Sequence, residues 1–316
     1  MLRKRAYKRP DERGQSAMEY LMTYAWAILI IAIVFAAFFA YLIFNPYTFE
    51  PRVQPGGCQV SKPLGPGTTN LASLTPGCNN DLPQYVMNSR GVGDFVNVPG
   101  SGLYSSPLNI QGNSITITAW VYVSGAPYHD VVDKELQYGM KLDYNNEPHA
   151  CTFPPNAQGW CLEWDTNQDW AGQSFLIPNA TKDRWIFLAV SQDGSMRYWY
   201  ADNAMIGNTS DGLPIRYADS NTTIGAISPG DYSGYGQAEW FNGSIANVQI
   251  YNISLPQSDI ETLYHEGIGG APIDLQDLVG WWPLNGNAND YSGNKDNGKI
   301  FNNSFSQSWL VNYPPP

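Results

Sequence analysis

The sequence predicts a mostly β protein that carries one membrane-spanning helix near its N-terminus. Three observations lead to this prediction. An almost unbroken apolar segment covers residues 17–44 of the 316-residue chain. Aromatic residues make up 14% of the chain, against only 14% charged residues, and 30 glycines and 23 prolines separate short apolar runs. Aromatic and β-branched residues favour strands, and glycine and proline favour the turns that join them, so the part after the helix is expected to be a β-sandwich.

The apolar segment is long enough to cross a membrane. As a helix it would span roughly 42 Å at 1.5 Å per residue, and a hydrocarbon core is about 30 Å thick. Six basic residues precede it within the first 13 residues, and basic flanks stay on the cytoplasmic side. We therefore expect a single-pass protein of the cell membrane, with a cytoplasmic N-terminus and an extracellular β domain. A plain signal anchor is the simplest alternative, whereas a cleaved secretory signal would need an apolar run about half as long.

The junction before the apolar segment, residues 13–21 (RGQSAMEYL), resembles the class III signal sequence of archaeal type IV pilin-like proteins. The resemblance implies that a prepilin-type peptidase cuts after Gly14 and leaves Gln15 as the N-terminus of the mature chain. It also implies that Glu19 pairs with the α-amine of an identical or related subunit in a filament. A charge within a membrane helix costs about 2.5–3.5 kcal/mol at mid-bilayer and normally has a partner. The alternative is that Glu19 extends to the cytoplasmic headgroups.

The net charge and the positions of the cysteines limit which ligands and metal ions the protein is expected to bind. The net charge is −11, and acidic residues outnumber basic ones throughout the part after residue 13, so nucleic acid is not an expected partner. Cys58 and Cys78 form one close pair along the sequence, and Cys151 and Cys161 form another. We predict two local disulfides in an oxidising compartment. A zinc site is the alternative, but the three histidines form no recognisable ligand set with these cysteines.

Seven runs after the membrane segment alternate in polarity or are rich in β-branched residues, as strands are. They are Asp94–Val98, Ser114–Val123, Trp160–Trp164, Trp185–Ser191, Met196–Ala201, Asn221–Ile227 and Gly243–Tyr251. Asp259–His265 is predicted as a short helix with Ser258 as its N-cap.

Four segments resemble, in order, the LamG-like jelly roll of the concanavalin A-like lectin and glucanase superfamily: 91–99 (GVGDFVNVP), 114–123 (SITITAWVYV), 185–201 (WIFLAVSQDGSMRYWYA) and 241–264 (FNGSIANVQIYNISLPQSDIETLY). Residues 278–303 (LVGWWPLNGNANDYSGNKDNGKIFNN) resemble the opening strand and Asp-rich loop of such domains, yet they come last. Too few residues remain for a second copy, so we expect a circularly permuted domain. The predicted organisation is a leader over 1–14, a transmembrane or pilin-like helix over 15–45, a disulfide-tied stalk rich in proline and glycine over 46–84 and the sandwich over 85–316.

The clearest candidate for a binding site is an aromatic and polar cluster around the third predicted strand. Aromatic faces stack on sugars, and carboxylates and amides bond their hydroxyls, so Trp164, Asp165, Asn167 and Trp170 are the predicted glycan contacts. Residues 163–168 (EWDTNQ) come near the laminarinase-type acidic pattern, but Gln168 replaces its last glutamate and leaves a glycosidase without its acid/base. We therefore expect no enzyme activity. Four other tryptophans in predicted strands are expected in the core: Trp120, Trp185, Trp199 and Trp281.

The Asp-rich loop carries the one candidate metal site. Asp290, Asn294 and Asp296 place oxygen ligands at short spacing, as a calcium site needs, although a turn shaped by Asn, Asp and Gly is the alternative. Six sequons are candidates for glycosylation: Asn179, Asn208, Asn221, Asn242, Asn252 and Asn302. The sequence thus predicts a surface protein that displays a lectin-like domain for adhesion or glycan binding. A structural surface module without a ligand is the alternative.

Overall fold

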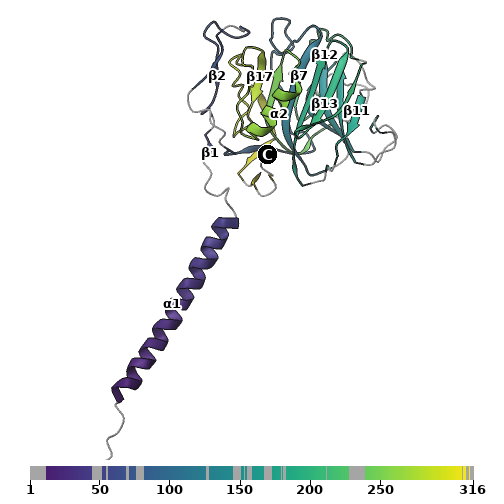
Figure 1. Ribbon diagram of the computed structural model, residues 1–316. Helices are drawn as coiled ribbons and strands as arrows, with labels where there is room; N and C mark the ends of the chain where they lie inside the picture. Colours follow the sequence, from purple (N-terminus) through teal and green to yellow (C-terminus); the bar gives the residue numbers. More distant parts are fainter. Residues whose placement is uncertain are drawn as a thin grey trace, which may run out of the picture. The chain divides into compact units, whose positions relative to one another are not determined.

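The computed structural model divides the chain into two compact units, Met1–Glu50 and Pro51–Pro316 (Figure 1). It describes residues 12–44, 52–54, 56–68, 71–75, 82–125, 128–144, 151–152, 154, 159–166, 173–178, 180, 183–210, 212–227, 239–307, 309–310 and 313.

The first unit contains the helix α1 (Glu12–Phe44). Within the described residues it is the one helix long and apolar enough to cross a membrane, over Met22–Ala40. Its large apolar side chains are exposed, with Trp26 at 64% and Phe35 at 57%. So much exposed apolar surface calls for lipid or partner helices around it. The helix begins before Gly14, so the predicted cleavage position lies within its first turn.

The second unit is a sandwich of two antiparallel sheets. The seven-stranded sheet has the order β11-β10-β9-β8-β15-β6-β18. Its strands are β6 (Phe95–Val98), β8 (Tyr128–Lys134), β9 (Tyr138–Tyr144), β10 (Trp160–Thr166), β11 (Gln173–Leu176), β15 (Thr222–Ile224) and β18 (Lys299–Phe301).

The eight-stranded sheet has the order β14-β13-β12-β7-β16-β5-β19, and β17 pairs with β16 beside this path. Its strands are β5 (Val86–Arg90), β7 (Ser114–Val123), β12 (Trp185–Asp193), β13 (Met196–Ala201), β14 (Ala204–Thr209), β16 (Asn242–Tyr251), β17 (Leu278–Trp282) and β19 (Ser304–Ser306).

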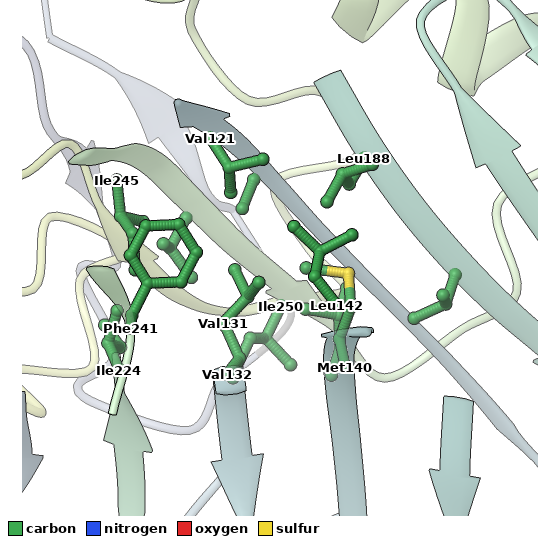
Figure 2. Close-up of a cluster of buried hydrophobic side chains, with 14 of the residues drawn as sticks. Val121, Val131, Val132, Met140, Leu142, Leu188, Ile224, Phe241, Ile245 and Ile250 are labelled. Atoms are coloured by element: carbon green, nitrogen blue, oxygen red, sulfur yellow. The ribbon is translucent and has the colours of Figure 1, made fainter. Parts of the chain in front are cut away.

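The main hydrophobic core lies between the two sheets. Alternation along each strand sends every second side chain inward, where aliphatic residues of both sheets interdigitate. Figure 2 shows Val121, Leu188, Ile245 and Ile250 of the eight-stranded sheet close to Val131, Val132, Met140, Leu142 and Ile224 of the seven-stranded sheet, with Phe241 beside them. The sandwich and the seven predicted strands are thereby confirmed, with boundaries that differ by up to three residues.

A second apolar cluster covers the outer face of the eight-stranded sheet. It packs Trp120, Trp185 and Phe187 against the helix α2 (Gln257–Glu266) and against Trp309 and Tyr313 near the C-terminus. The helix is confirmed, but its predicted N-cap is wrong. Pro256 holds the N-cap position, and its carbonyl oxygen accepts the first backbone hydrogen bonds. The four tryptophans predicted in the core are all buried: Trp120, Trp185, Trp199 and Trp281.

The C-terminal segment completes both sheets. β17 pairs antiparallel with β16, β18 pairs with β6, and β19 pairs with β5. All five residues of β17 are buried. The opening strand expected at the start of residues 278–303 is therefore confirmed over Leu278–Trp282, in the same sandwich as β7. That this order arose by circular permutation stays a prediction.

The described part of the segment predicted as a stalk forms two small sheets of its own and lies in the same compact unit as the sandwich. β1 (Arg52–Val53) pairs in parallel with β4 (Leu82–Pro83), and β2 (Val60–Ser61) pairs with β3 (Ser73–Leu74). The Val60 N–H donates to the Tyr291 carbonyl at 2.7 Å, and the Asn285 side chain donates to the Val53 carbonyl at 2.8 Å. The predicted boundary at residue 84 is wrong for the described part of this segment, because the compact unit begins at Pro51.

Candidate functional site

The outer face of the seven-stranded sheet is built from charged side chains. On β10, Leu162 and Trp164 point into the core, so Glu163 and Asp165 point outward. On β9, Met140 and Leu142 point inward, so Lys141 points outward. A period of two residues therefore separates an apolar face from a charged face along the same strands.

Strand register aligns these charged residues in two rows. Lys141 lies opposite Glu163 on one side and opposite Asp130 of β8 on the other. In the next row Gly139 lies between Asp165 and Asp133. Directly opposite residues in antiparallel strands are about 5 Å apart at Cβ, so their side chains interact.

Lys141 is the cation at the centre of this face. Its ammonium lies 3.3 Å from an Asp165 oxygen, 3.7 Å from Glu239 and 3.8 Å from Asp130. The side chains of Lys141 and Asp165 are about one-fifth exposed, and that of Glu239 is about one-third exposed. Asp130 has no exposed side-chain surface. The site thus has a reachable rim and a buried floor.

Burial and charge shift the pKa values of these groups strongly. Burial raises the pKa of the Asp130, Asp133 and Glu163 carboxyl groups well above the usual range, because the charged form loses its hydration. Burial alone would lower the pKa of Lys141, but the carboxylates of Asp130, Asp165 and Glu239 outweigh it and raise that pKa well above its ordinary value. Perturbed groups that cluster on one face are typical of functional sites.

An aromatic cluster continues the same face toward β18. Val96 and Val98 point into the core, so Phe95 points outward. Its ring stacks on Phe301 with centroids 4.6 Å apart, and the Trp240 ring lies 5.5 Å away. Trp240 directly follows Glu239 in the chain, so one peptide bond links the aromatic cluster to a residue of the charged rim.

Only part of the predicted glycan site lies on this face. Trp164 is fully buried in the main core, so its predicted role in stacking on sugar is wrong. Asp165 lies on the outer face, next to Lys141. Asn167 and Trp170 lie outside the described residues. The sequence reasoning missed Asp130, Lys141 and Glu239, although the alternation of residues 138–144 (YGMKLDY) was a signal for a strand with Lys141 on its polar side.

Two of the three predicted calcium ligands, Asp290 and Asn294, are hydrogen-bonded to groups of the protein itself. Asp290 accepts backbone hydrogen bonds from Trp281, Ser292 and Asp296 and a fourth hydrogen bond from the Ser292 hydroxyl. The side-chain oxygen of Asn294 accepts from the Gly67 N–H at 2.7 Å and from the Lys62 ammonium at 3.2 Å.

The Lys62 ammonium also donates to the Leu278 carbonyl at 2.8 Å, so a protein cation already stands among these oxygens. Burial and the neighbouring Asp290 raise the pKa of Asp296 to about 7, and Lys62 acts against this rise. In this arrangement the three residues do not fit a calcium ion, which needs six to eight free oxygen ligands.

The disulfide between Cys151 and Cys161 is present, with Cα atoms 5.5 Å apart, which confirms that prediction. Cys58 takes part in a disulfide as well, but its predicted partner Cys78 lies outside the described residues.

Three of the predicted glycosylation sites, Asn208, Asn252 and Asn302, are exposed, and Asn221 and Asn242 are half-buried. Asn179 lies outside the described residues. Attachment of glycans to these sites stays a prediction.

Comparisons with known proteins agree with this architecture. The sequence profile of the concanavalin A-like lectin/glucanases superfamily matches residues 96–261, which is more than half of the chain. A solved structure described as a carbohydrate-binding protein of Bacteroides ovatus aligns with a TM-score of 0.54 and 13% identity, over 72% of this chain and 61% of that protein. The heptameric SAP-like pentraxin of Limulus polyphemus aligns with a TM-score of 0.45 and 11% identity, over 59% of this chain and 83% of the pentraxin. No curated protein matches the sequence. At this identity the likeness to the B. ovatus structure shows the fold alone.

Proposed function

Because the chain belongs to the concanavalin A-like lectin/glucanases superfamily, we propose that its sandwich binds glycans on the outer face of the seven-stranded sheet. The observation that carries this proposal is the rim formed by Lys141, Asp165 and Glu239, on the same face as the aromatic cluster of Phe95, Trp240 and Phe301. Carboxylates accept hydrogen bonds from sugar hydroxyls, an ammonium donates to them, and an aromatic ring offers a stacking surface. The B. ovatus protein of the same fold is described as carbohydrate-binding, which supports the proposal by analogy.

We propose binding rather than hydrolysis. Glu163 and Asp165 lie on one face, as in the laminarinase-type pattern, but the chain carries Gln168 at the third acidic position. A retaining glycosidase needs a second carboxylate that donates a proton to the leaving group.

The binding test uses the soluble fragment 46–316, which contains the compact unit Pro51–Pro316 with its own core. On a glycan array it should bind at least one class of glycan. The variant Asp165→Asn should bind that glycan about tenfold more weakly, since a hydrogen bond to a charged group contributes about 1.5–3 kcal/mol.

Asp183→Asn is the matched control for this test, because Asp183 is exposed and lies just before β12 of the eight-stranded sheet rather than on the seven-stranded sheet. Its binding should be unchanged. Binding should also be equal with calcium and with a chelator, since Lys62 stands among the predicted calcium ligands. A folded fragment that binds nothing on the array would favour a structural module without a ligand, and release of reducing sugar would favour a glycosidase.

We further propose that α1 anchors the sandwich at the cell surface and that Gly14–Gln15 is the cleavage site of a prepilin-type peptidase. The apolar surface of α1 and the basic residues before it support anchoring. In this proposal Glu19 pairs with the new α-amine of a neighbouring subunit, and the sandwich is carried on a filament that serves adhesion.

Intact-mass analysis of the membrane-extracted protein tests the cleavage. The expected mature chain begins at Gln15 and retains the helix. A chain that still begins at Met1 would leave a plain anchor, and one that begins after residue 40 would show a cleaved secretory signal.

A further inference from the structure

A lysine and an asparagine contact each other where the segment after Pro51 meets the Asp-rich loop. The Lys62 ammonium donates to the side-chain oxygen of Asn294 at 3.2 Å. A carbonyl bond is about 1.2 Å long, so the Lys62 nitrogen lies at most about 4.4 Å from the side-chain carbon of Asn294. A small rotation at the end of the flexible lysine brings these two atoms to the separation of about 3–3.5 Å from which an amine attacks a carbonyl carbon.

The stem of Lys62 is packed tightly against the loop that carries Asn294. A Cβ atom at Gly293 would lie 2.9 Å from the Lys62 Cγ atom and 3.3 Å from its Cδ atom, and Gly293 has a φ of +89°. Glycine therefore leaves the space that the lysine stem fills. The ammonium also donates to the Leu278 carbonyl at 2.8 Å. These contacts keep the amine beside the Asn294 carboxamide.

The carboxamide of Asn294 is held in a polarising arrangement. The residue is 5% exposed. Its Oδ1 atom accepts a hydrogen bond from the Gly67 N–H at 2.7 Å, and its Nδ2 atom donates to the Val279 carbonyl at 2.7 Å. A backbone N–H directed at a carbonyl oxygen stabilises the negative charge that develops there when a nucleophile attacks the carbon. The Gly67 N–H is in the position to do this for Asn294.

A buried carboxylate lies two residues after Asn294. Within the described residues, the Oδ2 atom of Asp296 is buried and has no hydrogen-bond partner. The Asp296 carboxylate and the Lys62 ammonium interact electrostatically. An ammonium must lose a proton before its nitrogen can attack, and an adjacent carboxylate is a suitable acceptor for that proton. An unpartnered buried carboxylate oxygen calls for an explanation, and this role supplies one.

We propose that the folded protein joins Lys62 to Asn294 by an isopeptide bond. Asp296 takes a proton from the Lys62 ammonium, and the neutral amine attacks the Asn294 Cγ atom while the Gly67 N–H stabilises the negative oxygen. Asp296 then gives its proton to Nδ2 and receives one from the attacking nitrogen. The bond between Cγ and Nδ2 breaks, and ammonia leaves with the proton that Asp296 returns. One ammonium ion is released, Asp296 is again a carboxylate, and nothing is oxidised or reduced.

The bond ties the beginning of the compact unit to its end. It links two residues 232 positions apart and encloses every strand of the two large sheets except β18 and β19. A cross-link that closes so long a loop removes many conformations from the unfolded chain and so favours the folded state.

Mass spectrometry of fragment 46–316, after reduction and denaturation, tests the bond. The fragment should be lighter than its sequence by one ammonia molecule, and proteolysis should release a branched peptide in which the Lys62 side chain is joined to that of Asn294. Lys62→Arg should have the full mass, because a guanidinium stays protonated and does not attack. Lys299→Arg is the matched control, since Lys299 is exposed on β18, and it should still lose the ammonia.

The parent fragment alone can overturn the inference, whether or not the variants fold. A full mass without the branched peptide would show that no bond forms. Cyclisation of an asparagine also releases ammonia, so a loss that persists in Lys62→Arg would likewise contradict the bond.

The role of Asp296 is tested by the rate of ammonia loss after cell-free synthesis. Asp296→Asn keeps the shape of the side chain but cannot carry the proton, so the lighter species should appear about tenfold more slowly or not at all. Near-ultraviolet circular dichroism of this variant checks that it folds. An unchanged rate in the folded variant would overturn the assignment of Asp296 as the proton carrier.

Discussion

Deletion of residues 277–316 is expected to unfold the whole unit that begins at Pro51. The deletion removes β17, whose five residues are all buried, together with β18 and β19. It also removes the fully buried Trp282 side chain and exposes the core beneath it. Truncation of one buried large side chain typically costs about 3–5 kcal/mol, and a domain is stable by only about 5–15 kcal/mol. The truncated chain therefore cannot keep a cooperative fold.

Thermal unfolding followed by near-ultraviolet circular dichroism checks this, because the buried tryptophans give a signal that depends on packing. Fragment 46–316 should show one cooperative transition, and fragment 46–276 should show none. Fragment 46–316 is itself the control deletion, because the residues that it lacks, 1–45, lie in the separate unit Met1–Glu50. An unchanged melting temperature for fragment 46–276 would contradict the single-sandwich architecture.

Replacement of Lys141 by methionine is expected to destabilise the sandwich by about 3–5 kcal/mol at pH 7, the cost of breaking a buried ion pair from one side. Asp130 would lose its cationic partner while it stays buried. Methionine keeps the length of the side chain, so the effect reports charge rather than packing. Lys299→Met is the matched control, because Lys299 is exposed on β18 and should change stability by less than about 0.5 kcal/mol.

The loss should shrink as the pH falls below neutrality. Burial raises the pKa of Asp130, Asp133 and Glu163 in the folded state above the unfolded values near 4. When folding raises the pKa of a carboxyl group, the folded state holds that proton more tightly than the unfolded state does. The free energy of unfolding therefore falls as the pH rises from the unfolded-state pKa to the folded-state pKa, and it recovers when the group is protonated again. Without Lys141 these pKa values rise further. Urea unfolding at pH 5 and pH 7 should thus show a smaller difference between variant and wild type at pH 5, and a difference that grows on acidification would contradict this account.

Much of the fold could be predicted from residue pattern alone. Ser114–Val123 and Met196–Ala201 match the observed strands residue for residue, because continuous apolar or aromatic runs mark strands that are buried. β8 and β9 escaped prediction, because their outward positions carry Asp130, Lys141 and Asp143, and so many charges resemble a solvated loop. The charged residues that make these strands resemble loops are the same residues that form the candidate site.

The error at Trp164 came from ignoring strand parity. If Glu163 and Asp165 point outward, the residue between them must point into the core. By contrast, no local pattern could have predicted how the segment after Pro51 docks. Lys62 and Asn294 are 232 positions apart, and glycine and proline content does not indicate which surface a loop covers. Such contacts depend on the folded sandwich, not on the segment's own sequence.

The pairing of β18 with β6 and of β19 with β5 has a consequence for biosynthesis. β5 and β6, which are made before the other strands of the two sheets, receive neighbours from β18 and β19, which are made after all the others. Until residue 306 has left the ribosome and any export channel, β5 and β6 expose unpaired backbone edges, which invite association with other chains. Contacts between residues so far apart in the sequence also form slowly. The chain must therefore be kept from aggregating until residues 299–306 are available to pair with β5 and β6.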